Sequence, residues 1–175
     1  MDEGPTGYRR VGVQRYRETV GFYYEEFTVG DVFEHRPGRT ITEMDNVLMS
    51  MLGMNASPLH IDAAYMKHTR WEQPIVSSLV TLGIVGGMTA RSTSGRAVAN
   101  LGWDNIRLLS PVLAGDTLYA ETEIMMKRPS QSYTDHGIVG CRTLGIKSTG
   151  EKVISFDRSF LVPMREHSRD AEVGY

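Results

Sequence analysis

The chain has 175 residues, 41% of them hydrophobic, and a formal net charge of -2, which predicts one domain large enough to bury its own core. Its single cysteine, Cys141, excludes an internal disulfide and favours a reducing, cytoplasmic location. No apolar run reaches the roughly 18 residues of a membrane span, and the N-terminal sequence lacks the apolar stretch of an export signal. Because 19 basic residues are balanced by 21 acidic ones without a long basic run, we expect neither nucleic acid nor membrane as a partner.

The chain divides into a central domain and two polar ends. Residues 1–22 contain glycine and proline and have no sustained hydrophobic period, so they predict an N-terminal arm. Residues 165–175 mix charges with few apolar side chains and predict a flexible C-terminal tail. No internal repeat or low-complexity segment lies between them. We therefore expect one domain over residues 23–164.

The first predicted element is a strand over residues 32–41. Pro37 cannot donate to a sheet ladder and Gly38 is typical of a bulge or turn, so this strand is expected at a sheet edge. A short helix follows, from a capping-box sequence at residues 42–45 to Gly53. Local signals thus define both its start and its end.

A polar loop separates this helix from a second short one over residues 63–69, for which Asp62 is the expected N-cap. Residues 77–93 are apolar nearly all the way round, which is typical of a buried helix and too short for a bilayer. This helix carries three glycines, at positions 83, 86 and 87. Each costs about 1 kcal/mol of helix propensity relative to alanine, so we expect other backbone to pack closely there.

Downstream, the hydrophobic period changes from about 3.6 to 2, which predicts strands. They are expected at residues 99–109, 117–126, 137–146 and 152–162. The last two are expected to form a hairpin, and short connections between all four indicate an antiparallel sheet. A helix of 17 residues is about 25 Å long, enough to lie across such a sheet. The predicted fold class is α+β, with an antiparallel sheet wrapped around one central helix.

The best candidate for a functional site is the polar loop over residues 54–62, just ahead of the buried helix. Polar side chains in a loop beside an apolar core are typical of small-molecule sites. The loop contains one histidine, His60, a residue type that titrates near neutrality and can transfer protons. From the pattern alone, a capping or packing role for His60 is the simpler alternative.

Several segments around this loop carry a pattern with fixed spacing: PLHIDAAY at residues 58–65, QPIV at 73–76, the glycine-bearing helix, residues 21–31 and SPVLAGDTL at 110–118. The pattern resembles the MaoC-like family of hot-dog-fold dehydratases and (R)-specific enoyl-CoA hydratases, and covers most of residues 21–163. The resemblance implies a single hot-dog domain over residues 23–164. The hydrophobic periods lead independently to the same sheet around a helix.

One position departs from the family's hydratase motif, which has an aspartate five residues before the histidine and an asparagine three before it. Here these positions hold Asn55 and Ser57. This variant, together with the sequence VSSLVTLG at residues 76–83, resembles the subgroup of mesaconyl-CoA hydratases, which act on methyl-branched, dicarboxylic CoA thioesters. The resemblance therefore implies reversible hydration of a short α,β-unsaturated acyl-CoA.

The resemblance also assigns roles. His60 is the expected acid and base, and Asn55, which cannot take a proton, can hold water or the thioester through its amide. The backbone N–H of Ser78, by alignment with the family, is the expected oxyanion donor at the helix N-terminus. The expected substrate-binding residues are Ser57, Pro58, Val76 and Ser77. No cofactor is expected, because CoA is part of the substrate.

Other chemically active side chains carry weaker signals. A second substrate carboxylate would need a cation, and the candidates are Arg70, Arg91 and Arg107. The basic pair at residues 127–128 fits a solvated strand end better than a CoA phosphate site, and Cys141 fits a small core residue better than a nucleophile. No cluster of histidine, cysteine or carboxylates has the spacing of a metal site, so we expect no metal.

Two alternative functions stay open. The first is a hot-dog thioesterase. Many of these enzymes place a carboxylate on or at the start of the central helix, and residues 77–93 contain none, which counts against this alternative. A non-catalytic acyl-CoA-binding protein is the second, since Asn55 in place of aspartate could have ended the chemistry. In every case a lone hot-dog sheet leaves an edge strand and part of the helix uncovered, so we expect a homodimer or a higher homo-oligomer.

Overall fold

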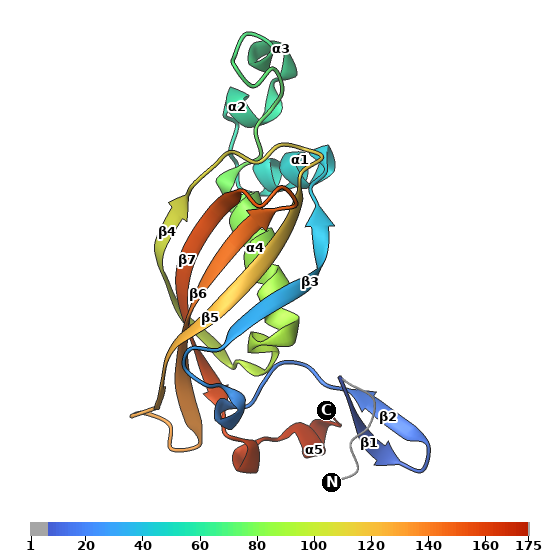
Figure 1. Ribbon diagram of the computed structural model, residues 1–175, viewed down its shortest axis with the longest axis vertical. Coiled ribbons are helices and arrows are strands. Elements are labelled where there is room, and N and C mark those ends of the chain that lie inside the picture. The colour runs from blue at the N-terminus through green and yellow to red at the C-terminus, as the bar shows by residue number, and fades with distance from the viewer. Residues whose placement is uncertain (1–6, 175) are drawn as a thin grey trace.

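The computed structural model describes residues 7–174 and consists of a curved antiparallel sheet that wraps around one long helix, α4 (Figure 1). The five strands are β3 (Val32–Thr40), β4 (Ala99–Leu108), β5 (Thr117–Pro129), β6 (His136–Lys147) and β7 (Lys152–Pro163). Their order in the sheet is β3-β5-β6-β7-β4. The predicted α+β fold with a sheet around a central helix is confirmed.

The two edge strands of the sheet are β3 and β4. The edge position of β3 was predicted from Pro37. The register of β3 against β5 shifts between His35 and Arg39, where Pro37 and Gly38 interrupt the ladder. The predicted hairpin is confirmed as well, because β6 and β7 pair along nearly their whole length.

Three short helices precede the long one: α1 (Glu43–Leu52), α2 (Pro58–Ile61) and α3 (Ala63–Met66). The Thr42 side chain accepts a hydrogen bond from the Asp45 N–H and caps α1, and Asp62 caps α3 in the same way. The prediction of a loop over residues 54–62 was wrong in part, since α2 forms within it. Proline is well suited to the first turn of a helix, where its missing N–H is not needed.

Helix α4 (Ser78–Ser92) buries one face against the sheet through Val80, Thr81, Val85, Gly86 and Thr89. The opposite face is open in the single chain, where Leu79 is 49% exposed. The prediction of a helix buried on every side was therefore wrong for the chain alone. An apolar sequence pattern does not tell which neighbour covers each face.

The glycines of α4 have different surroundings. A Cβ atom added at Gly86 would lie 2.7 Å from the Trp103 ring, whereas one added at Gly87 would meet nothing within 4 Å. The expectation that backbone packs closely against all three was wrong. The close neighbour is a single aromatic side chain from β4.

Besides the core that α4 helps to form, the fold has a second cluster of buried side chains to which α4 contributes no residue. Its members are Phe27, Ile124, Val139, Cys141, Phe160 and Val162. Cys141 is a small residue of this core, as the alternating strand pattern predicted. Burial raises the pKa of its thiol. A thiol in this environment is protonated and unreactive at neutral pH.

The two ends of the chain carry short elements at the end of the molecule opposite to α2 and α3 (Figure 1). Strands β1 (Tyr8–Gly12) and β2 (Arg15–Glu18) form a hairpin within the predicted arm, and α5 (Asp170–Val173) lies within the predicted tail. Residues 1–6 and 175 of these predicted segments lie outside the described residues. Within residues 7–174, no helix combines the length and the apolar character that a membrane span needs.

Candidate active site

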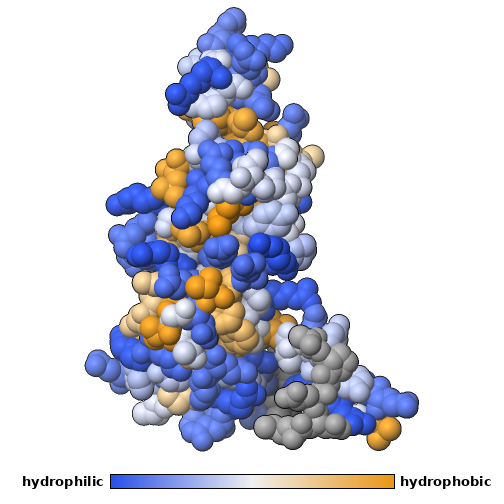
Figure 2. Space-filling view, viewed as in Figure 1, coloured by the Kyte–Doolittle hydropathy of each residue, from blue (hydrophilic) through white to orange (hydrophobic). Residues whose placement is uncertain are grey.

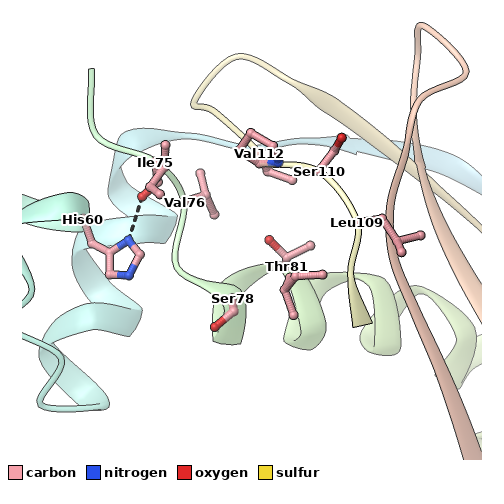
Figure 3. Close-up of a pocket in the computed structure, with 10 residues that line it drawn as sticks. His60, Ile75, Val76, Ser78, Thr81, Leu109, Ser110 and Val112 are labelled. Atoms are coloured by element: carbon pink, nitrogen blue, oxygen red, sulfur yellow. Dashed lines mark hydrogen bonds between the residues drawn. The ribbon is translucent and has the colours of Figure 1, made fainter. Parts of the chain in front are cut away.

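His60 lies on the helical turn α2, beside the extended segment that leads into α4. Its Nδ1 forms a hydrogen bond of 2.8 Å with the carbonyl oxygen of Ile75 (Figure 3). Because a carbonyl oxygen only accepts, Nδ1 must carry the proton. In the neutral ring, Nε2 then keeps its lone pair and is the atom that can take a proton from a reactant.

His60 borders a cavity of about 280 Å³ that opens between α2, the start of α4 and the segment after β4 (Figure 3). Its lining consists of His60, Ile75, Val76, Ser78, Thr81, Leu108, Leu109, Ser110, Pro111 and Val112. Two segments distant in sequence are joined here, because the Val76 N–H donates to the Val112 carbonyl at 2.8 Å. Apolar walls with a few polar groups are typical of a small-molecule site.

The N-terminus of α4 faces the same cavity through Ser78. Ser77 is the N-cap of this helix, and its side chain makes no capping hydrogen bond. The first N–H groups of a helix have no acceptor within the helix, and the helix dipole places partial positive charge there. The structure thus brings the expected proton carrier and the expected oxyanion donor to one cavity.

Asn55 lies elsewhere. It lines a different cavity of about 340 Å³, together with Ser50, Met51, Met54, Ala56 and Ile61. Its Oδ1 accepts a hydrogen bond of 3.3 Å from the Ser57 N–H, a short-range contact typical of asparagine in turns. In the single chain, Asn55 and His60 therefore do not line the same cavity, and their joint role stays a prediction.

The other expected substrate-binding residues divide in the same way. Val76 lines the cavity of His60, whereas Ser57 and Pro58 are not part of its lining. Ser77 is 1% exposed, and its N–H donates to the side chain of Asn46. Ser77 therefore acts as a buried connection between α1 and α4.

Sequence reasoning missed Asn46. This residue is 4% exposed on α1 and hydrogen-bonds three backbone groups in two segments, α2 and the stretch that leads into α4. A signal was present in the sequence, because Asn46 and Ser50 form a polar pair four residues apart in a helix that is otherwise rich in methionine, leucine and valine. Such a pair marks a polar strip on one helix face, in which Asn46 has hydrogen-bond partners and the buried Ser50 hydroxyl has none.

The three candidate cations for a substrate carboxylate do not line the cavity. Arg70 lies 4.3 Å from the centre of the Trp71 ring, and Arg91 pairs with Glu18 at the far end of α4. Arg107 is on β4, one residue before the lining residue Leu108. In the described part of the chain, no group of three histidine, cysteine or acidic residues is arranged to hold a metal ion.

Residues 25–143 match the family model described as MaoC like domain. The chain belongs to this family. The resemblance predicted from the loop of His60 is thereby confirmed for most of the domain.

Relatives of this MaoC-like chain are named for hydration and dehydration. It is 28% identical over 155 residues to a mesaconyl-CoA hydratase of Cereibacter sphaeroides, covering 89% of this chain and 45% of the relative. It is also 28% identical over 151 residues to a beta-methylmalyl-CoA dehydratase of Chloroflexus aurantiacus, covering 86% of this chain and 43% of the relative. The chain thus spans less than half the length of these curated relatives.

Solved structures confirm the hot-dog fold. A conserved hypothetical protein of Mycobacterium tuberculosis, described as having a double hotdog fold, superimposes with a TM-score of 0.76 at 23% identity. The match covers 85% of this chain and 46% of that one. The MaoC-like chain therefore corresponds to one hot-dog unit.

Proposed function

We propose that this MaoC-like chain reversibly hydrates the double bond of a short α,β-unsaturated acyl-CoA thioester, methyl-branched or dicarboxylic in the manner of mesaconyl-CoA. The observation that carries this proposal is the cavity shared by His60 and Ser78. The names of the relatives support the reaction type and the acyl group.

Hydration adds a hydroxyl group to the β-carbon and a proton to the α-carbon of the thioester. In the proposed mechanism, Nε2 of His60 takes a proton from water while the water oxygen bonds to the β-carbon. The electrons of the double bond move to the thioester oxygen, where the N–H of Ser78 and the positive end of α4 stabilise the negative charge. The enolate then collapses as the imidazolium returns its proton to the α-carbon, and dehydration reverses each step.

The size of the cavity supports a short acyl group. Its volume of about 280 Å³ lies just below the range of roughly 300–1,000 Å³ that is usual for ligand sites. Val76, Leu109 and Val112 provide apolar surface suited to a methyl branch. Since no lysine or arginine lines it, a dicarboxylic substrate would need a cation from outside this lining. Arg107 is next to the lining residue Leu108 on β4, but successive side chains of a strand point to opposite faces.

We further propose that the active form is a homodimer. One face of α4 leaves apolar side chains such as Leu79 exposed in the single chain, and one structural neighbour has a double hotdog fold. A second copy of this chain would cover the open face of α4. The proposed reaction needs no cofactor, and the single cysteine agrees with a cytoplasmic location.

A second function has one observation in its favour. Asn55 replaces the usual aspartate of the motif and lines a different cavity from His60, which is compatible with a chain that binds acyl-CoA without converting it. A thioesterase has less support, because neither α4 nor the lining of the cavity shared by His60 and Ser78 contains a carboxylate. Glu43 lines a separate cavity beside His60.

Purified protein mixed with a panel of enoyl-CoA thioesters tests the proposal. The panel contains straight-chain, methyl-branched and methyl-branched dicarboxylic acyl groups, and loss of the conjugated thioester absorbance reports hydration. We expect the fastest turnover for a branched member. Binding of the same thioesters without turnover of any of them would favour the non-catalytic alternative.

A further inference from the structure

Asn46 is a buried side chain that uses both ends of its amide. Its Nδ2 donates to the carbonyl oxygen of His60 at 2.8 Å and to that of Ile75 at 3.4 Å. Its Oδ1 accepts from the N–H of Ser77 at 2.8 Å. Two carbonyl acceptors on one side and one N–H donor on the other leave a single amide orientation that satisfies all three groups.

These three backbone groups belong to the two parts of the candidate site whose relative position matters, namely His60 and the start of α4. The His60 carbonyl belongs to the residue that would carry the proton. The Ile75 carbonyl also receives the Nδ1–H of His60 and so sets the ring orientation. The Ser77 N–H precedes the residue whose N–H would stabilise the thioester oxygen.

We propose that Asn46 is the positioning residue of this site. The inference rests on the proposed hydration reaction. It assigns to Asn46 the alignment of the proton carrier, His60, with the oxyanion donor at the start of α4. Asn46 lines a separate cavity of about 180 Å³ with His60, but not the cavity that His60 and Ser78 share, so in the proposed reaction it acts through these residues rather than on the substrate. It keeps the proton on Nδ1 of His60 by fixing the Ile75 carbonyl, and it fixes the start of α4 relative to the imidazole ring.

A purely structural role for Asn46 predicts a different result. An amide that only satisfied buried backbone groups would lower the free energy of unfolding when replaced and would leave the chemistry of folded molecules unchanged. Replacing a positioning residue changes both the state of the imidazole ring and the reaction rate, since a misplacement of about 1 Å in a reacting group can cost about 100-fold in rate.

The variant Asn46→Asp separates the two ends of the amide. A carboxylate still accepts from the Ser77 N–H, but it cannot donate to either carbonyl and repels both. Asn46→Ala removes all three hydrogen bonds and serves as the second variant if the aspartate prevents folding. Gln131→Glu is the matched control, because it makes the same amide-to-carboxylate change at an exposed turn residue.

The first measurement is independent of activity. Nitrogen-15 NMR of the imidazole rings, with His60 assigned through a His60→Gln variant, reports which ring nitrogen carries the proton. We expect the His60 ring to carry its proton on Nδ1 in the wild type and in Gln131→Glu. In the Asn46 variants we expect a mixture of the two tautomers. An Nδ1–H ring that is unchanged in both Asn46 variants would overturn the proposal.

The second measurement is steady-state hydration by the same proteins. We expect kcat of the Asn46 variants to fall about 10- to 100-fold, with KM within about threefold of the wild type. A kcat equal to that of Gln131→Glu would overturn the positioning role while leaving hydration intact. If the wild type hydrates none of the thioesters, the proposed function fails, and the tautomer measurement still decides whether Asn46 orients the ring.

Discussion

His60 donates from Nδ1 to the carbonyl oxygen of Ile75, a residue 15 positions further along the chain. The Ile75 segment is itself held in place, since its N–H donates to the Leu59 carbonyl at 3.0 Å and the residue bridges to Leu113. The orientation of the imidazole ring therefore depends on tertiary contacts of an extended segment. The short helix α2 alone could not provide it.

Replacement of Asn55 by aspartate tests the unusual motif position. The carboxylate can still accept from the Ser57 N–H, so the turn before α2 should keep its geometry. We expect hydration to continue, with the ratio of kcat/KM between branched and straight-chain thioesters changed by at least several-fold. If Asn55→Asp hydrates a thioester that the wild type only binds, the non-catalytic alternative is correct.

The buried His35 predicts a loss of stability in mild acid. Its ring nitrogens hydrogen-bond the hydroxyl groups of Ser92 and Thr122. Burial, followed by the charges of Arg158 and Arg36, lowers the pKa of His35 to about 4. Between pH 6.5 and 4 the unfolded chain therefore binds a proton that the folded chain does not, so stability falls as the pH falls.

This effect is measurable by denaturant unfolding at two pH values. From the size of the pKa shift, the contribution of His35 to the free energy of unfolding should be about 2 kcal/mol smaller at pH 5 than at pH 7.5. A His35→Gln variant should be less stable at pH 7.5 and should lack this part of the dependence. Equal losses in both proteins would show that His35 titrates normally in the fold.

Two glycines of α4 form a matched pair. Gly86→Ala should lower the free energy of unfolding by about 1–3 kcal/mol, because the added methyl group would lie 2.7 Å from the Trp103 ring. Gly87→Ala meets nothing within 4 Å in the single chain. Because Gly87 shares the open face of α4 with Leu79, its effect is measured in the monomeric Leu79→Glu background, where it should raise the free energy of unfolding by about 0.5–1 kcal/mol through helix propensity. Thermal unfolding of the two variants measures the difference, and effects of the same sign would contradict the packing described for this helix.

The open face of α4 predicts self-association. Light scattering should give twice the chain mass for the wild type, as expected if a second copy covers Leu79. Leu79→Glu should yield folded monomers. Val29→Glu, a change at another exposed apolar residue, should leave the dimer intact, and a monomeric wild type would rule out the proposed assembly.

The sequence predicted the sheet and the helix caps well because these depend on local rules. Alternation marked β5, β6 and β7, and Pro37 marked an edge strand. The open face of α4 was not predictable in this way. The apolar side chains of α4 predict that each face of the helix is buried, but they do not indicate whether the same chain or a second one buries it.

The candidate site was predicted in part for a related reason. A motif names His60 and Ser78, and the fold brings them to one cavity. The motif does not show that α2 forms between residues 57 and 62, with Asn55 in a different cavity. The polar pair of Asn46 and Ser50 marks one face of α1, but the three partners of Asn46 are backbone groups, which a side-chain pattern does not identify.

Turnover by His60→Gln is the most direct test of hydration at this cavity. The control is His68→Gln, a neighbouring exposed histidine outside the cavity, and thermal unfolding confirms that both variants are folded. With the best thioester of the panel, kcat/KM of His60→Gln should be lower than that of the wild type by about 10²- to 10⁴-fold, the usual contribution of a general acid or base, while His68→Gln keeps its activity. A folded His60→Gln protein that hydrates the thioester as fast as the wild type would contradict the assignment of His60 and of this cavity.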